Sequence, residues 1–341
     1  MNISDDHGIR TATLSVEEAL HRSKDDRPDV DLLRVDDPAP EHWPALEESG
    51  FILKPQWITW VARAEQDEDT YLARLSSREC KAIRKARRAA EADRVQIGVH
   101  EPPTEEAVDG FLRLYRRQIA AMRHGVDYAH AERDALLDPA NCYLVVTGHV
   151  DNDLVGAVVC RSNRARDAMI VRFTATTPEA RRRRLNRVLY LHAFSIARKM
   201  QLSFISLGSD PALYGALTEP GLHSFKTGLG FSPVPEHHIA EDDDKDEAIL
   251  ILRASALTDP ALIVAYDMTR DRPTFAPPRR AIAAALDDPV PLRLVVVTVA
   301  GEDDAQPLAQ VSSRVPPIPA FSLGCARTVD GLAWRRPEDG T

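Results

Sequence analysis

Four consecutive arginines, Arg181 to Arg184, stand between an apolar stretch at 168–176 and a helical pattern that begins at Leu185. The apolar stretch predicts a β-strand, and the pattern after the arginines predicts a helix with one buried side. A positive turn between a strand and a helix N-terminus is suited to hold phosphate or pyrophosphate, because the helix dipole and its free N–H groups attract anions. We expect one or two of these arginines to contact a phosphate and the others to be solvated.

A second group of reactive side chains lies between the apolar strand pattern at 203–207 and the end of a short helical pattern at 222–229. Lys226 could supply positive charge to a developing oxyanion or to a phosphate, and the alternative is a lysine on a solvated helix face. A general base remains open among His223, Asp210, Glu219 and Tyr214. His223 has a suitable ordinary pKa, although a single histidine is more often structural.

Other common chemistries find little support in the sequence. The adjacent His237 and His238, near acidic residues 242–244, lack the spacing of metal ligands, so no metal site is expected. No Gly-x-Ser-x-Gly, Walker or dinucleotide fingerprint occurs. The four cysteines are far apart and form no CxxC, which is typical of reduced thiols in a cytoplasmic protein.

The elements that must position these residues follow from periodicity. A helix at 76–92 has a serine N-cap and many cations, which could form a solvated face or a basic face for a phosphate-rich donor. The segment 101–123 has one apolar stripe typical of a helix. The remaining expected elements are strands at 94–100, 142–147, 154–160, 168–176 and 203–207, helices at 185–200 and 222–229, and a final hairpin of 231–240 with 248–254 around an acidic, solvated tip at 241–247.

We expect three parts along the chain. Residues 1–70 form a partly irregular N-terminal extension. In it Pro55 divides an apolar stretch, which is expected to form two short strands or an edge strand. Residues 71–255 form the central domain. Residues 256–341 form a Pro-rich C-terminal α/β extension with one helix, one strong strand at 291–300 and a disordered tail from Arg335.

The order of elements over 94–254, with a basic turn between the fourth strand and its helix, resembles the GNAT superfamily of N-acetyltransferases. The resemblance implies an α+β fold whose central, mostly antiparallel mixed sheet is flanked by helices. More particularly, Leu207-Gly208, Phe225-Lys226 and Gly230-Phe231 resemble the Fem-type and Fem-like acyltransferase branch. In that branch a strand ending in Leu-Gly precedes a helix with Phe-Lys and a closing Gly-Phe, and an Arg/Lys-rich segment like 76–92 precedes the domain.

The resemblance implies an N-acyltransferase whose acyl donor is acyl-CoA, with acetyl-CoA favoured, and whose acceptor is an amine of a small molecule or peptide. The candidate donor-binding residues for this reaction are Arg181, Arg182, Arg183, Arg184, Asn186 and Phe225. The candidate catalytic residues are Lys226, which the resemblance places at the acyl-donor end, and His223 and Tyr214, which lie just before it in the chain. Core packing is the alternative role of Phe225.

The sequence departs from the GNAT pattern, and these departures leave alternative acyl donors and functions open. Residues 183–187 (RRLNR) stand where GNAT enzymes carry a glycine-containing pyrophosphate turn, and no glycine is present here. This loss and the basic helix favour a Fem-like aminoacyltransferase that uses aminoacyl-tRNA. The net charge of −9 and the missing helical arm of some Fem enzymes favour acyl-CoA. A third alternative is a catalytically inactive GNAT-like binding module.

Bulk composition sets outer limits on the function. The chain has 341 residues, of which 44% are hydrophobic and 28% charged, which is ordinary for a globular protein. No apolar run approaches the length of a membrane span, and the N-terminus lacks a secretion signal, so a cytoplasmic protein without membrane insertion is expected. Global acidity argues against DNA as a partner, whereas local basic patches leave room for tRNA.

Overall fold

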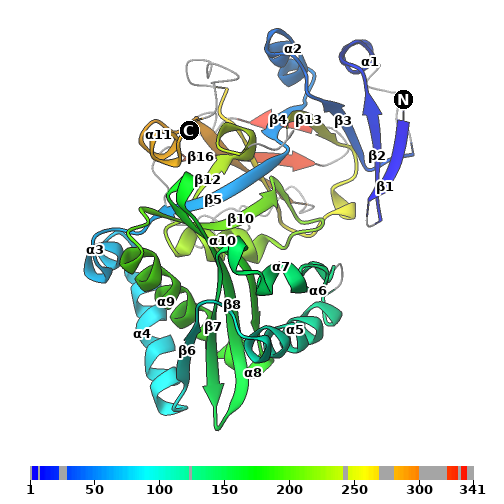
Figure 1. The fold of residues 1–341 in the computed structure, drawn as a ribbon. Helices are drawn as coiled ribbons and strands as arrows, with labels where there is room; N and C mark the ends of the chain where they lie inside the picture. Colours follow the sequence, from blue (N-terminus) through cyan, green and yellow to red (C-terminus); the bar gives the residue numbers. More distant parts are fainter. Residues whose placement is uncertain are drawn as a thin grey trace. The chain divides into compact units, whose positions relative to one another are not determined.

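The computed structural model describes residues 2–6, 8–22, 29–122, 125–240, 245–268, 280–298, 321–328 and 332–335 (Figure 1). The chain divides into two compact units, each assembled from separate stretches. The first unit contains Met1–Thr59, Ser209–Thr227 and Ser232–Thr341, and the second contains Trp60–Gly208 and Gly228–Phe231. This division differs from the three consecutive parts expected above, and where independently folding domains begin and end stays a prediction.

The second unit is built around a mixed sheet whose strands run in the order β5-β10-β9-β8-β7-β6. Strands β6 to β9 form an antiparallel meander, and β10 pairs parallel to β9. The fold class expected from the sequence is therefore confirmed. The strands are β5 (Trp57–Arg63), β6 (Gln96–His100), β7 (Tyr143–Val150), β8 (Asp153–Asn163), β9 (Ala168–Thr176) and β10 (Phe204–Pro211).

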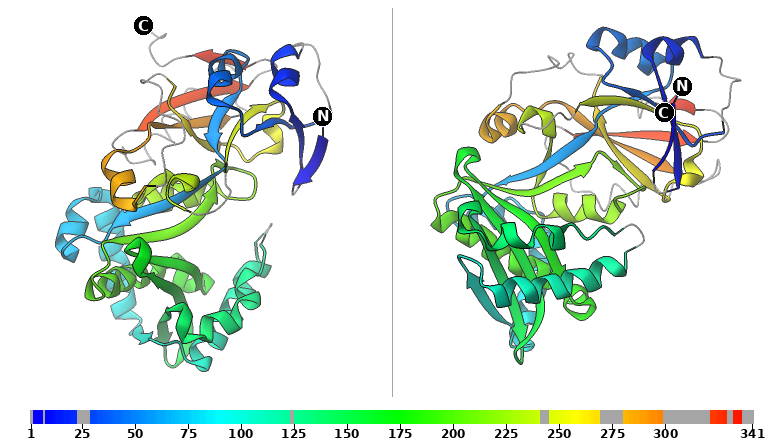
Figure 2. Two further views of the ribbon diagram at one scale, coloured as in Figure 1. Left: turned by 45° about the horizontal axis from the view of Figure 1, so that its top comes forward. Right: turned by 45° about the vertical axis from the view of Figure 1, so that its right-hand side comes forward.

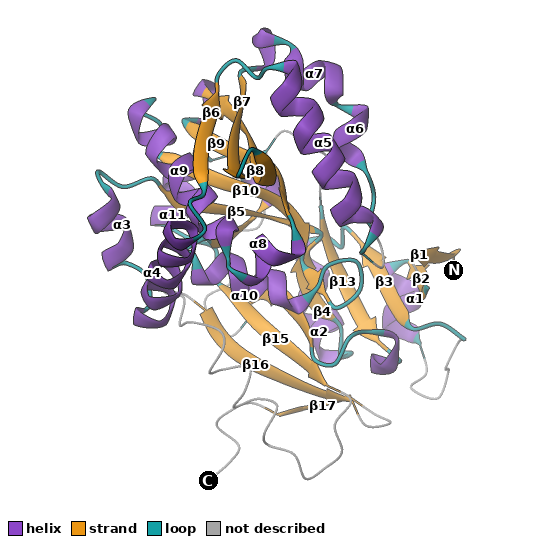
Figure 3. Ribbon diagram, turned by 90° about the horizontal axis from the view of Figure 1, so that it is seen from below, coloured by secondary structure: helices purple, strands orange, loops and turns teal. Residues whose placement is uncertain are grey.

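Helices cover both faces of this sheet (Figures 1 and 3). Helix α5 packs its apolar stripe on one face, where Phe111 and Tyr115 join Val145, Val159 and Phe173 in one core. Val145 pairs with Val159 and Val159 pairs with Phe173 in the register of β7, β8 and β9, so the three side chains share one face of the sheet. The helices of the unit are α3 (Glu68–Ala73), α4 (Ser77–Ala92), α5 (Glu105–Ala120), α6 (Tyr128–Ala131), α7 (Arg133–Leu137), α8 (Pro178–Arg182) and α9 (Leu185–Lys199).

Helix α9 lies on the opposite face, with α4 beside it (Figure 3). Gly156 of β8 allows this close approach, because a Cβ atom there would lie 3.1 Å from methyl groups of Leu185 and Leu189. The start of α9 is therefore fixed against the middle of the sheet. This placement fixes the basic turn that precedes the helix.

The first unit contains two five-stranded sheets (Figure 2). Their inner faces share a core in which Ile9, Ile52 and Ile249 pack with Ile263 and Val295. One sheet, β1-β2-β3-β13-β4, comprises β1 (Asn2–Asp6), β2 (Ile9–Leu14), β3 (Leu32–Asp36), β13 (Asp246–Ile251) and β4 (Ile52–Pro55). The other, β11-β14-β15-β16-β17, comprises β11 (Leu213–Tyr214), β14 (Ala261–Tyr266), β15 (Leu292–Thr298), β16 (Phe321–Thr328) and β17 (Leu332–Arg335).

The remaining elements of this unit are short. Helices α1 (Val16–His21) and α2 (Trp43–Glu48) follow β2 and β3 in the chain. Helix α10 (Pro220–Gly228) and strand β12 (Ser232–Pro235) flank the segment Gly228–Phe231, and α11 (Ile282–Asp287) precedes β15. None of the described helices has the length and apolar character that crossing a bilayer requires.

One expectation about the first unit is wrong, namely the final hairpin of 231–240 with 248–254. β13 instead lies between β3 and β4 and pairs with both. A run of apolar residues predicted the strand, but it could not identify the partners of that strand. Within residues 1–45, β2 and β3 pair in parallel as parts of the same sheet.

The expected solvated tip at 241–247 is wrong at its C-terminal end. Glu247 is buried in an ion pair with Lys54, whose side chain is also buried. Asp246 accepts a hydrogen bond from the Tyr266 hydroxyl at 2.5 Å, and burial raises the pKa of Asp246 to about 7. Residues 241–244 lie outside the described residues, as do 336–341 of the expected disordered tail.

Candidate functional site: a basic hollow and a buried acid–base cluster

A hollow of about 360 Å³ opens on the second unit between the first turns of α4 and the turn before α9. We call it the basic hollow, and it is lined by Ser77, Arg78, Lys81, Ala82, Lys85 and Arg184. Its lining residues include no carboxylate. Lys81, Lys85 and Arg184 are exposed and form no ion pair with a described residue. The hollow is therefore a concentration of positive charge open to solvent, which is suited to an anion.

The sequence of α4 explains why its cations line the hollow. Ser76 caps the helix by accepting a hydrogen bond from the Glu79 N–H at 3.2 Å. Ala82, Ile83 and Ala86 are buried, so this side of α4 packs inward. The cations lie on the remaining surface because their positions fall outside that apolar stripe. The exposed cations are compatible with both alternatives, a solvated face and a basic face for a phosphate-rich donor, and the choice between them stays a prediction.

Arg184 occupies the turn before α9 in a left-handed conformation, with φ of 64°. This conformation ends the short helix α8 and starts α9, whose N-cap side chain makes no capping bond. The partial positive charge of the α9 N-terminus therefore adds to the cations of the hollow. The expected basic turn from strand to helix is present, with α8 inserted between them.

The four consecutive arginines have different surroundings. The Arg181 guanidinium donates to Gln118 Oε1 at 2.5 Å. Arg182 pairs with Glu179 at 2.7 Å, and Arg183 pairs with Asp93 at 3.1 Å. Only Arg184 lines the basic hollow. Phosphate binding by the other three stays a prediction, and the exposed ion pairs of Arg182 and Arg183 are weak enough to exchange for another anion.

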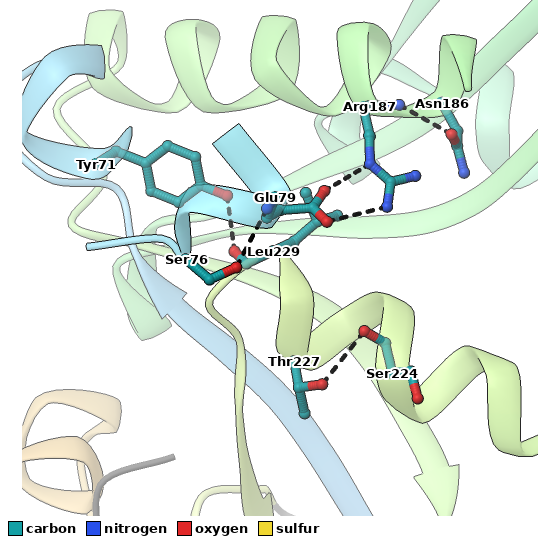
Figure 4. Close-up of polar contacts among 8 residues, drawn as sticks. All are labelled: Tyr71, Ser76, Glu79, Asn186, Arg187, Ser224, Thr227 and Leu229. Carbon is teal, nitrogen blue, oxygen red and sulfur yellow. Dashed lines mark hydrogen bonds and ion pairs between the residues drawn. The ribbon is translucent and has the colours of Figure 1, made fainter. Parts of the chain in front are cut away.

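A buried ion pair joins α4 to α9 next to the hollow (Figure 4). Arg187 donates through Nε and an Nη atom to both carboxylate oxygens of Glu79, at 2.5 and 3.2 Å. The side chains of Arg187 and Glu79 are only 14% and 9% exposed. The Asn186 side chain accepts a hydrogen bond from the Arg187 N–H at 3.0 Å, so Asn186 caps the turn internally in this conformation.

The closing Gly-Phe pair expected from the sequence, Gly230-Phe231, is in contact with Leu75 and Phe194 and follows Leu229. The Tyr71 hydroxyl donates to the Leu229 carbonyl oxygen at 2.7 Å (Figure 4). Gly230 has φ of 77°, and a Cβ atom there would lie 2.8 Å from Leu75. Phe231 packs edge-on against Phe194 of α9. Glycine is therefore required at position 230 by both backbone conformation and space.

The first unit contains a separate group of buried polar side chains, the Asp210 cluster, made of Asp210, Tyr214, His223 and Lys226. The Lys226 ammonium donates to Asp210 Oδ2 at 2.7 Å, and the Tyr214 hydroxyl donates to the same oxygen at 2.9 Å. The His223 ring lies edge-on to Tyr214, with ring centres 5.4 Å apart. The structure thus brings together three residues predicted as catalytic and one candidate base.

Burial limits what this cluster can contact. His223 and Tyr214 have no exposed surface, and Lys226 is 5% exposed, so the alternative of a solvated surface lysine is wrong. Burial lowers the pKa of Lys226, and the attraction of Asp210 opposes this shift. Burial, with a smaller contribution from Lys226, lowers the pKa of His223 to about 3. A base or oxyanion donor must reach its substrate, so catalytic roles for these residues require an opened conformation and stay predictions.

Two other predicted residues lie outside the cluster's buried centre. Phe225 is half-buried on α10, and Glu219 is exposed before it. Gln118 and Glu79 were not predicted, and both contact the basic turn. Their types carried no special signal, since each lies on a helix where a polar residue is ordinary.

The pH dependence of folding tests the burial of His223. Because the folded-state pKa of about 3 lies below the ordinary 6.5, the unfolded chain takes up the proton first. Stability from neutral His223 is therefore complete above pH 6.5 and is lost as pH falls toward 3. Between pH 7 and 5 this histidine should account for a fall of about 2 kcal/mol in the free energy of unfolding. We expect that fall to be absent in His223→Phe when unfolding by urea is measured at both pH values.

Tyr214→Phe is the matched control, because it keeps an aromatic ring beside His223 and keeps the titrating imidazole. Its unfolding free energy should decline with falling pH as steeply as that of the unchanged protein. If the unfolding free energy of His223→Phe declines as steeply as that of the unchanged protein, His223 is not the group responsible.

No group of three or more His, Cys, Asp or Glu side chains among the described residues could hold a metal ion. The His237 and His238 rings pack edge to face with ring centres 4.4 Å apart, and His238 is buried. Burial lowers the pKa of His238 to about 3. Cys142 is exposed and Cys160 is buried, and both are free thiols.

Residues 77–214, which include the basic hollow, match the family model of an acetyltransferase (GNAT) domain. This stretch is therefore similar to GNAT domains. The resemblance stated from the sequence is thereby confirmed at the level of the superfamily. A search of the curated proteins gave no match.

Solved structures with a similar arrangement include FemX, at 12% identity over 66% of this chain and 73% of that chain, with a TM-score of 0.43. L-PGS from Bacillus licheniformis is similar at 12% identity over 64% and 67% of the chains, with a TM-score of 0.41. A tandem GNAT protein from the clavulanic acid biosynthesis pathway is similar at 13% identity over 65% of each chain, with a TM-score of 0.36. At these values the similarity does not choose among their activities.

Proposed function

We propose that the chain is an N-acyltransferase that takes an acyl group from acyl-CoA, acetyl-CoA in the first instance, and transfers it to an amine. The observation that carries the proposal is the basic hollow, which lies inside the GNAT domain and combines four cations with the N-terminus of α9. Coenzyme A presents phosphates that these charges would bind. The residues present therefore suit the phosphate-bearing part of this donor.

In the proposed reaction a neutral amine attacks the thioester carbonyl carbon. A C–N bond forms, the C–S bond breaks and coenzyme A leaves as its thiolate, and the proton that the amine loses passes through a base to that thiolate. The domain contributes by holding the donor in one place, which converts the encounter into an intramolecular reaction. The acceptor is proposed only as an amine of a small molecule or peptide.

Aminoacyl-tRNA is the second candidate donor, and one observation favours it. Arg84 and Arg88 are exposed on α4 but do not line the basic hollow, so positive charge continues along the helix beyond it. An extended polyanion would use this additional charge, whereas one coenzyme A molecule would not need it. Binding without turnover, as in an inactive module, is the third outcome that an experiment must separate.

The test measures donor binding by isothermal titration with CoA and with aminoacyl-tRNA at several salt concentrations. We expect the combined substitution Lys81→Gln, Lys85→Gln and Arg184→Gln to raise the Kd for CoA by about tenfold to a hundredfold. Higher salt should weaken binding, because these charges are exposed.

The matched control carries Arg84→Gln and Arg88→Gln, which remove charge from the same helix outside the hollow. It should leave CoA binding unchanged under the first proposal and weaken tRNA binding under the second. CoA binding that ignores the hollow substitutions would contradict the proposed site. Thiol release from acetyl-CoA with a panel of amines distinguishes an enzyme from a binding module.

A further inference from the structure

The outer edge of β9 lies beyond its register with β10 over its second half. β9 pairs with β8 as far as Thr176, whereas its register with β10 covers only Ala168–Ile170 among the described residues of both strands. The Thr177 N–H donates to the Val155 carbonyl on the β8 side. Because backbone groups alternate between the two edges of a strand, Thr174 and Thr176 direct theirs to the outer edge.

The Gln118 side chain of α5 contacts two of these backbone groups. Gln118 Nε2 donates to the Thr174 carbonyl at 3.3 Å, and Gln118 Oε1 accepts from the Thr176 N–H at 3.1 Å. One carboxamide thus makes the donor and acceptor contacts that an amide group of an extended ligand would make with a strand edge. Gln118 imitates a ligand amide on β9.

Arg181 stabilises the Gln118 side chain in this position. Its guanidinium donates to Gln118 Oε1 at 2.5 Å and to the Thr176 carbonyl at 3.4 Å. Arg181 belongs to α8, which leads directly into the turn at Arg184. The side chain that covers the strand edge is therefore connected to the turn that lines the basic hollow.

We propose that Gln118 is a displaceable plug, whose carboxamide occupies the place on β9 where an amide of the extended donor arm pairs. This inference rests on the proposed function, since acyl-CoA carries such amides in the arm between its nucleotide and its thioester. Donor binding exchanges the Gln118 contacts for equivalent donor contacts. A ligand without an amide at this place would lose the Gln118 hydrogen bonds and replace none, so the plug determines donor specificity.

Gln118 is suited to such an exchange. It is half-buried and lies near the end of α5, which ends at Ala120. Rotation of one side chain frees the strand edge without breaking a helix hydrogen bond. The two released β9 groups must then be satisfied by water or by a ligand.

The experiment measures binding of two probes, CoA and pantetheine, to the full chain carrying Gln118→Ala. We expect the Kd of both probes to fall by about tenfold, because binding no longer has to break the Gln118 hydrogen bonds. The matched control is Arg117→Ala, which changes the exposed neighbouring residue and should leave both constants unchanged. Hydrogen exchange at the Thr176 amide is the second readout: faster in Gln118→Ala alone, and slow again with CoA bound.

The outcomes separate this inference from the proposed function. Unchanged or weaker binding by Gln118→Ala, while hollow substitutions weaken CoA, overturns the plug and leaves the function standing. In a second outcome, Gln118→Ala binds pantetheine more tightly, but the substitutions in the basic hollow leave the Kd of CoA unchanged. That result supports the plug and overturns the phosphate site. If no variant binds either probe, both proposals are overturned.

Discussion

Lys226→Met is expected to lower the free energy of unfolding by about 3–5 kcal/mol, because it removes the ammonium partner of a buried carboxylate. Asp210 is 8% exposed, and Lys226 approaches one of its oxygens at 2.7 Å. Without the lysine, the carboxylate keeps the Tyr214 hydrogen bond but loses its positive partner. Urea unfolding at pH 7 measures the change.

A double variant shows whether the loss comes from the unpaired charge. Lys226→Met combined with Asp210→Asn removes both charges and keeps an oxygen that can accept from Tyr214. It should recover a large part of the lost stability, because a buried pair replaced at both ends costs less than a pair broken at one end. If the double variant is as unstable as the sum of the two single variants, the side chains are energetically independent and the assignment is wrong.

The same variants bear on catalysis. If Lys226 acts as an oxyanion donor in an opened conformation, turnover should fall in the double variant even though stability returns. If its role is confined to folding, turnover should return together with stability. The double variant thus distinguishes the two roles.

Local patterns predicted the elements of the second unit well. The serine before α4, the apolar stripe of α5 and the strand that ends at Thr176 are all near their expected places, since each depends on neighbours in sequence. β4 ends at Pro55 and β5 begins at Trp57, so the apolar stretch is divided at the proline as expected. These features are encoded over a few residues, so a single sequence is sufficient to detect them.

Partners distant in sequence could not be predicted in the same way. The acidic residues at 246–247 look solvated in the sequence, but β13 inserts between β3 and β4 and Glu247 becomes buried against Lys54. The four arginines look equivalent, but only Arg184 reaches the hollow. Burial and pairing depend on which segments the fold brings together, and residue type alone does not specify this.

Arg187→Met is expected to destabilise the second unit by about 3–5 kcal/mol, since it leaves the Glu79 carboxylate buried without its bidentate partner. Both oxygens of Glu79 accept from Arg187, at 2.5 and 3.2 Å (Figure 4). The loss is expected to exceed that of an exposed pair. Arg183→Met is the matched control, because Arg183 is 56% exposed in its pair with Asp93 and such a pair contributes about 0–1 kcal/mol.

The position of this ion pair also predicts an effect on the donor. Glu79 lies within the first turn of α4, and Arg187 lies within the first turn of α9, so their bond fixes the two helix starts that line the basic hollow. The variant Arg187→Met with Glu79→Gln should regain stability but bind CoA more weakly, because the hollow keeps its charges and loses their spacing. Unchanged CoA affinity in this double variant would show that the ion pair serves folding alone, and that the cations of the hollow are positioned by the apolar contacts of α4 and α9.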